Sequence, residues 1–161
     1  MAKARPIPDL TSEHSYAEAA AMVISVRAQE LGEHAQGVLD TGDIERVHDM
    51  RVTTRRLRAA LEIFEPCFPE RAYREALTEV KRLADALGER RDRDVAIASL
   101  HHFNDQMAAP DRRGIGSLIT RLRDEQDEAN TELAPLVSDE QLRSLRQSME
   151  ELVAGARESA G

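Results

Sequence analysis

Hydrophobic residues recur every three or four positions along most of this chain, which is the spacing of one face of an α-helix. Proline, glycine and short polar runs separate these periodic segments. We expect Gly88 to end or kink one helix and residues 108–116 to form a loop. The pattern predicts helices over about 12–39, 43–65, 70–87, 91–107, 115–133 and 138–158. Short connections between amphipathic helices indicate an all-α protein, an antiparallel bundle of about four to six helices.

The length fits one domain. With 161 residues, the chain can form a single core, which we place at residues 12–158 behind a flexible N-terminal arm at residues 1–11. Aromatic residues make up only 3% of the chain and tryptophan is absent, as expected for a helical protein. The single cysteine, Cys67, excludes an intrachain disulfide, and no apolar run is long enough for a membrane span. We therefore expect a soluble, cytoplasmic protein.

A row of cations stands out in the predicted helix at 43–65. At about 100° per residue, His48, Arg51, Arg55 and Arg58 fall within roughly an 80° arc beside the apolar face. We call these residues the cation ladder. Arginines at this spacing repel one another by a few tenths of a kcal/mol per pair, so their alignment indicates an anionic ligand along that edge. The net charge of −8 makes any such site local. The guanidinium fork suits phosphate oxygens.

Two separated blocks resemble the signature of the CHAD family, the conserved histidine α-helical domain. The first block is Val47–Arg58, read as VHDMRVxxRRLR, and the second is Leu83–Val95, with LxxxLGxxRDxDV. The order and separation of the blocks also match that family. The resemblance is clear over roughly residues 30–100 and only general elsewhere.

The resemblance implies a helical bundle that binds inorganic polyphosphate, with some relatives located at polyphosphate granules. By motif, the binding residues it implies are His48, Arg51, Arg55, Arg56, Arg58, Lys81 and Arg91. Arg56 matches the motif but falls outside the arc of the cation ladder. We expect Asp92 and Asp94 to pair with arginines or to cap a helix after Gly88. The family's domain is usually about twice as long as this chain, so we expect a homodimer in which a second copy supplies the missing bundle.

Other interpretations of these residues remain open. Acids such as Glu62, Asp85 or Glu89 would neutralise the ladder internally, and His48 would be an ordinary core histidine. We expect Arg90 and Arg93 to be solvated. The neighbouring His101, His102 and Asp105 do not make a convincing metal set. We identify no catalytic motif and no cofactor site, and therefore expect a non-enzymatic protein.

The alternative function is a helical adaptor that binds an acidic protein segment or targets a storage granule. Nucleic-acid binding is the weakest reading, because the chain is acidic overall and the basic segment offers no aromatic residue for base stacking.

Overall fold

The computed structural model describes residues 2–160 and the side chains of residues 2–158. This part of the chain is all-α, with two short 3-10 turns at Glu65–Cys67 and Ala134–Val137, and it contains no β-strand. The α-helices are α1 (Tyr16–Glu33), α2 (Ile44–Ile63), α3 (Glu70–Asp105), α4 (Ala109–Leu133) and α5 (Asp139–Ala160). The all-α prediction is confirmed. No helix in the described range is both long enough and apolar enough to cross a membrane.

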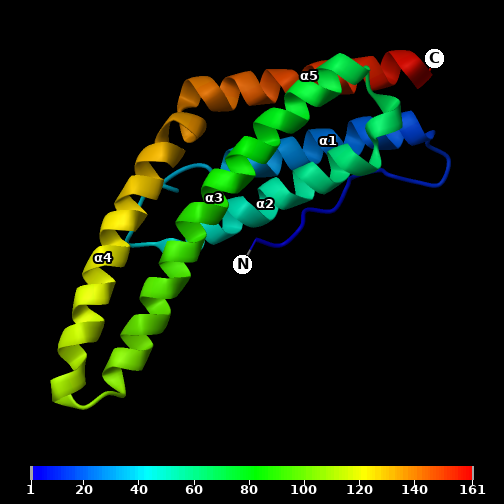
Figure 1. The fold of residues 1–161 in the computed structure, drawn as a ribbon. Coiled ribbons are helices and arrows are strands. Elements are labelled where there is room, and N and C mark those ends of the chain that lie inside the picture. Colours follow the sequence, from blue (N-terminus) through cyan, green and yellow to red (C-terminus); the bar gives the residue numbers. More distant parts are fainter. Residues whose placement is uncertain (1, 161) are drawn as a thin grey trace.

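The helices form a bundle with a projecting hairpin (Figure 1). Helices α1, α2 and α5 pack together with the first half of α3, while the second half of α3 runs antiparallel to α4 away from this bundle. The contribution of α3 to the hydrophobic core ends at Leu87, about halfway along the helix. The bundle therefore holds the main core, and the hairpin extends beyond it.

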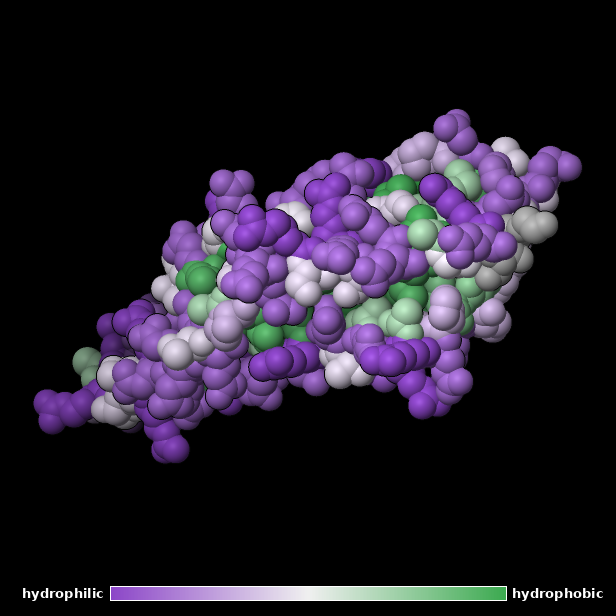
Figure 2. Space-filling view, turned by 90° about the horizontal axis from the view of Figure 1, so that it is seen from above, coloured by the Kyte–Doolittle hydropathy of each residue, from purple (hydrophilic) through white to green (hydrophobic). Residues whose placement is uncertain are grey.

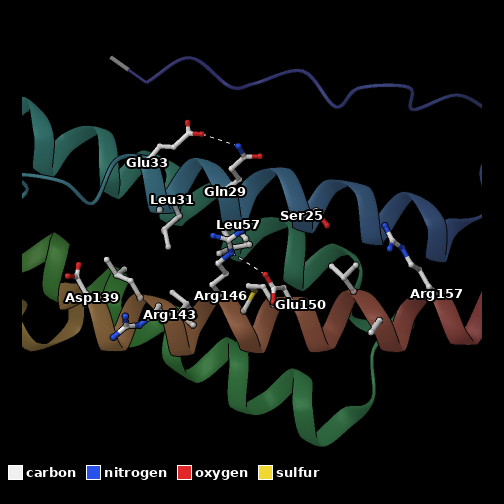
Figure 3. Close-up of a pocket in the computed structure, with 17 residues that line it drawn as sticks. Ser25, Gln29, Leu31, Glu33, Leu57, Asp139, Arg143, Arg146, Glu150 and Arg157 are labelled. Atoms are coloured by element: carbon white, nitrogen blue, oxygen red, sulfur yellow. Dashed lines mark hydrogen bonds and ion pairs between the residues drawn. The ribbon is translucent and has the colours of Figure 1, made fainter.

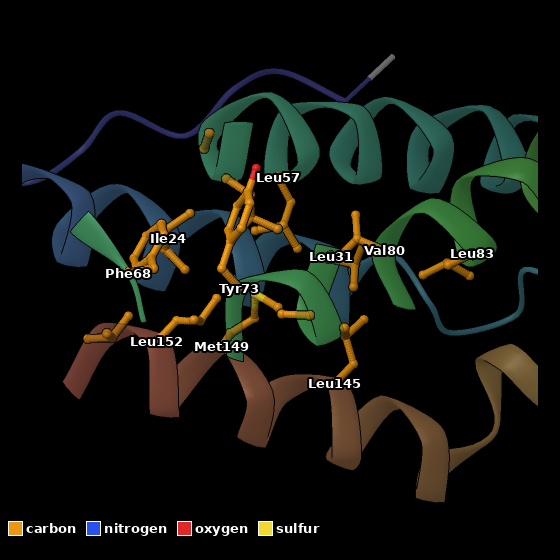
Figure 4. Packing of buried hydrophobic residues seen from close by; sticks show 14 of the residues in the cluster. Ile24, Leu31, Leu57, Phe68, Tyr73, Val80, Leu83, Leu145, Met149 and Leu152 are labelled. Atoms are coloured by element: carbon orange, nitrogen blue, oxygen red, sulfur yellow. The ribbon is translucent and has the colours of Figure 1, made fainter. Parts of the chain in front are cut away.

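The core is built from the apolar faces that the sequence pattern predicts. Leu57 of α2, Val80 and Leu87 of α3, and Met149 and Leu152 of α5 are almost completely buried. Figure 4 shows these helices meeting around Tyr73, with Leu57, Met149 and Leu152 nearby. Burial of each such side chain stabilises the fold by roughly 1.5–3 kcal/mol.

Helix α1 is shorter at both ends than the predicted 12–39. It begins after Ser15, whose hydroxyl accepts the amide hydrogen of Glu18, and the Glu18 carboxylate accepts the amide hydrogen of Ser15 (2.7 Å). This capping box fixes the start four residues later than expected. These hydrogen bonds also lower the pKa of Glu18. The helix ends at Glu33, and Gly37 then adopts a φ of +70°, a conformation that few other residues tolerate.

The predicted break at Gly88 and the predicted loop at 108–116 were both wrong. Helix α3 runs through Gly88 without interruption, because a single glycine in a long helix costs only about 1 kcal/mol and its neighbours are well packed. Helix α4 begins at Ala109, with Pro110 in its first turn, where proline loses no helical hydrogen bond. At the last helix, Ser138 caps α5 by accepting the amide hydrogen of Gln141 (3.2 Å).

The N-terminal arm lies along α1 and α2. The backbone amide of Ala2 donates to Asp49 Oδ1 (2.7 Å), and Arg56 Nη2 donates to the carbonyl of Ala2 (2.8 Å). Further along, the amide of Arg5 donates to Glu30 Oε1 (2.6 Å). The arm therefore makes specific contacts with the bundle.

The hairpin leaves several large apolar residues exposed. Val95, Phe103 and Leu118 are 46%, 49% and 45% exposed. Two helices alone have no third element to cover their apolar positions, so these side chains face solvent. This is the part of the fold where periodicity predicted the helices but not what covers them.

Candidate anion-binding site on helices α2 and α3

The cation ladder lies on the α2 edge beside the buried face. Val47, Met50, Leu57 and Leu61 of the same helix are fully buried. His48, Arg51 and Arg58 are half-buried, and Arg55 is exposed. Packing of the apolar face therefore fixes the rotation of α2 and holds the ladder at the bundle surface.

Most ladder side chains have no intramolecular partner. In the described part of the chain, no hydrogen bond or ion pair engages the side chains of His48, Arg51 or Arg55. Only Arg58 is paired, with its Nε 2.9 Å from Glu62 Oε1 in the same helix. The proposed neutralisation by Asp85 or Glu89 of α3 does not occur, and Glu89 pairs with Arg93 instead. Guanidinium groups without carboxylate partners keep their donors available for an external anion.

Helix α3 provides a second set of cations beside the ladder. Arg91 Nη1 donates to the carbonyl of Ile44 at the start of α2 (3.0 Å) and lies 3.6 Å from Glu45 Oε1. Because α2 and α3 are antiparallel neighbours, a register set by this contact puts Lys81 within about one helical turn of Arg55 along the bundle. Lys81 is half-buried and also has no partner among the described residues.

Gly88 lies between Lys81 and Arg91 on α3, at about the level of His48 in the same register. A Cβ atom built at Gly88 would meet no atom within 4 Å. The space where a side chain would begin at Gly88 is therefore open.

Arg56 is separated from the other predicted site residues. Its Nη2 donates to the arm at Ala2, and its Nη1 is buried without a partner. Arg56 also lies near Glu30: burial alone would raise the pKa of that carboxyl, but hydrogen bonds from Arg27 and from the Arg5 amide, together with the charges of Arg27 and Arg56, outweigh burial and lower it. Arg56 therefore belongs to the contact between α2 and the N-terminal arm.

The prediction that Arg90 is solvated was wrong. Its side chain is completely buried, and Nε donates to Asp94 Oδ1 (2.9 Å). Its Nη1 donates to Asn130 Oδ1 (2.5 Å), and Gln126 Nε2 of α4 donates to the same Asp94 oxygen (2.6 Å). Asn130 in turn donates to the carbonyl of Leu39 (2.8 Å), which precedes α2. This network ties the start of α2 to α3 and α4.

The second sequence block, Leu83–Val95, therefore contributes to the buried network through Arg90 and Asp94 and to the surface beside α2 through Arg91. The expectation that Asp94 pairs with an arginine is confirmed. The alternative, that an aspartate caps a helix after Gly88, is wrong because α3 continues through Gly88. Adjacent Arg90 and Arg91 point to different surroundings because neighbouring helical positions lie about 100° apart. The sequence signal that identifies Arg90 as internal is its spacing with Tyr73, Val80, Leu83 and Leu87 on the buried face of α3.

A large cavity lies elsewhere, between α1 and α5 (Figure 3). Its volume is about 990 Å³, its floor includes Leu31, Leu57 and Met149, and its rim includes Arg143 and Arg157. Figure 2 shows apolar surface between polar side chains on the face that carries α5. A second cavity of about 460 Å³ lies between the start of α2 and the α3–α4 hairpin. Neither is lined by a ladder residue, although Asp94 of the second sequence block lines the smaller one.

The arrangement on α2 and α3 suits binding of an extended anion. The ladder runs over eleven residues of helix, from His48 to Arg58, a rise of about 15 Å. Its donors lie along one line and do not converge on a single point. No group of three or more histidine, cysteine, aspartate or glutamate side chains in residues 2–158 is placed to hold a metal ion. A line of forked donors can follow a polymer of phosphate groups.

Comparison with known protein families agrees with the two sequence blocks. A family model for the CHAD domain matches residues 23–161, which is most of the chain. The match includes every helix after the first turns of α1. No curated protein matches the chain.

Proposed function

Because the chain belongs to the CHAD domain family, we propose that it binds inorganic polyphosphate, without catalysis, through the cation ladder, Lys81 and Arg91. The observation that carries this proposal is the absence of intramolecular partners for His48, Arg51, Arg55 and Lys81 in the described structure. Aligned like charges destabilise a helix slightly, and an anionic ligand would remove that cost. Arg56 is left out of the binding set, because it donates to the N-terminal arm.

The geometry of the ladder matches a flexible polyanion. Successive ladder positions rise about 5 Å along the helix, close to the span of two phosphate units. Each charge-assisted hydrogen bond contributes roughly 1.5–3 kcal/mol. Four to six such bonds, less the cost of ordering the polymer, suffice for the roughly 8 kcal/mol of micromolar binding. Counterion release supplies part of this energy, so the affinity falls steeply with salt.

The test is calorimetric titration of long-chain polyphosphate at two salt concentrations. Single-stranded DNA at the same phosphate concentration serves as the control ligand. We expect tight, salt-sensitive binding of polyphosphate and much weaker binding of DNA. The triple variant Arg51→Glu, Arg55→Glu, Arg58→Glu should lose at least about 100-fold in affinity, because it loses several charge-assisted hydrogen bonds and its new carboxylates repel the ligand.

A charge-matched variant separates the loss of the ladder itself from the effect of a more negative net charge. Arg113, Arg143 and Arg157 are exposed and have no partner among the described residues, and they lie on α4 and α5. Their triple replacement by glutamate changes the net charge by the same amount. We expect it to bind polyphosphate nearly as the parent does. Equal losses in both triple variants, or binding by the ladder variant at the parent's affinity, would refute the proposed site.

The second candidate function is an adaptor that binds an acidic protein segment. The same unpaired arginines favour it, since carboxylates and phosphates accept the same forked donors. Competition between polyphosphate and poly-glutamate of equal charge discriminates the two. Displacement of polyphosphate by poly-glutamate at equal charge concentration would favour the adaptor.

We also propose that the protein acts as a homodimer and associates with polyphosphate granules in the cytoplasm. A second copy would supply the bundle that the longer family members carry in one chain. The exposed Val95, Phe103 and Leu118 of the hairpin support this idea, because a second copy would cover them. Native mass spectrometry at micromolar concentration should show a dimer, and Phe103→Asp should shift it towards monomer. A strictly monomeric parent protein contradicts this proposal.

A further inference from the structure

The cation ladder has a carboxylate at each end. The spacing of its members continues from Arg58 to Glu62, which occupies the next position on the same edge of α2. Glu62 is already ion-paired with Arg58, and the two side chains are 45% and 40% exposed. A polyanion that extends past Arg58 along this edge therefore meets a negative charge.

The opposite end also carries a carboxylate, on the side of α2 that meets Arg91 of α3. Glu45 stands one turn before His48, about 60° outside the arc of the ladder, is 60% exposed, and lies 3.6 Å from Arg91. Between the two acids, the basic side chains without a partner among the described residues are His48, Arg51, Arg55 and, from α3, Lys81. The basic stretch is therefore bounded, and from His48 to Arg58 it rises about 15 Å.

We propose that Glu45 and Glu62 are end stops that limit the bound ligand to a linear segment of about six phosphate units. This inference rests on the proposed function and specifies its ligand: a short oligophosphate, or one short segment of a longer chain. Phosphate units beyond that length leave the helix or face a carboxylate. The intrinsic affinity of one site therefore stops rising once the chain covers the ladder.

The end stops also explain why two of the cations are paired while the others are not. An acid at each end of the row is stabilised by the nearest cation, Arg58 or Arg91, and stands next to the outermost phosphate. An exposed pair of this type contributes at most about 1 kcal/mol, so an anion can displace it. The central cations have no such competitor in the described structure.

The test compares the parent with the double variant Glu45→Gln, Glu62→Gln. Binding is titrated with tripolyphosphate and with defined chains of roughly six and roughly twenty units. For each ligand, the ratio of variant to parent affinity is taken, because the number of overlapping registers on a long chain cancels in that ratio. We expect a ratio near one for tripolyphosphate, which fits inside the ladder, and a rise to at most about tenfold for the longest chain.

Glu70→Gln, Glu75→Gln is the matched control. These two glutamates pair with Arg74 and Arg71 of α3 at the same four-residue spacing. The control carries the same charge change and should give a ratio near one at every length. A gain in the end-stop variant that is equal for all lengths, or no gain at any length, overturns the end-stop role. Failure of the parent protein to bind any of these ligands refutes the proposed function instead.

Discussion

Arg90 on α3 and Arg55 on α2 lie in opposite surroundings within the same pair of helices. Arg90 is fully buried, and its guanidinium donates to Asp94 and Asn130. Arg55 is exposed and has no partner among the described residues. The comparison shows that residue type alone does not tell which arginines are free to meet a ligand. The availability of donors does, because a guanidinium whose hydrogen bonds are already made has little left to offer a ligand.

The two arginines also differ in their contribution to stability. A buried charge is tolerated only when it is paired and hydrogen-bonded, so every partner of Arg90 matters for folding. An exposed arginine within a row of like charges stabilises nothing by itself. Substitutions should therefore separate the two regions into one that affects folding and one that affects ligand binding.

The largest expected effect on stability is that of Arg90→Ala. It leaves Asp94 buried without its cation and should lower the free energy of unfolding by about 3–5 kcal/mol. Urea unfolding followed by circular dichroism measures this change. Arg55→Ala, the control on the neighbouring helix, should change the free energy of unfolding by less than about 0.5 kcal/mol. Similar losses in the two variants would remove the distinction between the two regions.

The sequence predicted the elements that depend on local chemistry. Helical periodicity located α2, α5 and the apolar faces of the bundle. The ladder was also predicted, because the angles between positions on one helix follow from their spacing.

The features that sequence did not predict depend on neighbours in space. The burial of Arg90 requires Gln126 and Asn130 of α4, and these residues lie more than thirty positions away in the chain. The exposure of Phe103 reflects the lack of a third helix beside the hairpin. Gly88 was predicted to end or kink a helix because glycine disfavours helical conformation locally. The packing of the neighbouring Leu87 in the core, which supports α3 at this point, is not visible in the sequence.

A smaller effect is expected at Gly88, where α3 passes the open space beside the ladder. Gly88→Ala should raise the free energy of unfolding by about 0.5–1 kcal/mol, because a helical glycine is costly and an added Cβ meets nothing within 4 Å. Thermal unfolding measures the gain. Gly88→Glu should keep the fold and weaken polyphosphate binding, because it places a carboxylate at the level of His48. Unchanged binding in Gly88→Glu would place the ligand away from α3.

The smallest expected effect concerns Glu79 on α3, a half-buried charge that has neither the partners of Arg90 nor the exposure of Arg55. Its Oε2 is buried without a hydrogen bond, and burial, aided by the charge of Glu75, raises its pKa above the usual 4.5. Because the folded-state pKa is the higher one, the stability linked to protonated Glu79 is complete below about pH 4.5 and is lost as the pH rises through the raised pKa.

Glu79→Gln should therefore stabilise the protein by less than about 1 kcal/mol at neutral pH and leave its stability nearly unchanged in acid. Urea unfolding at both pH values measures the difference. The control is Glu75→Gln, which removes the neighbouring charge together with its exposed pair with Arg71 and should give a smaller gain. A gain of the same size at both pH values would show that Glu79 acts through packing and not through its charge.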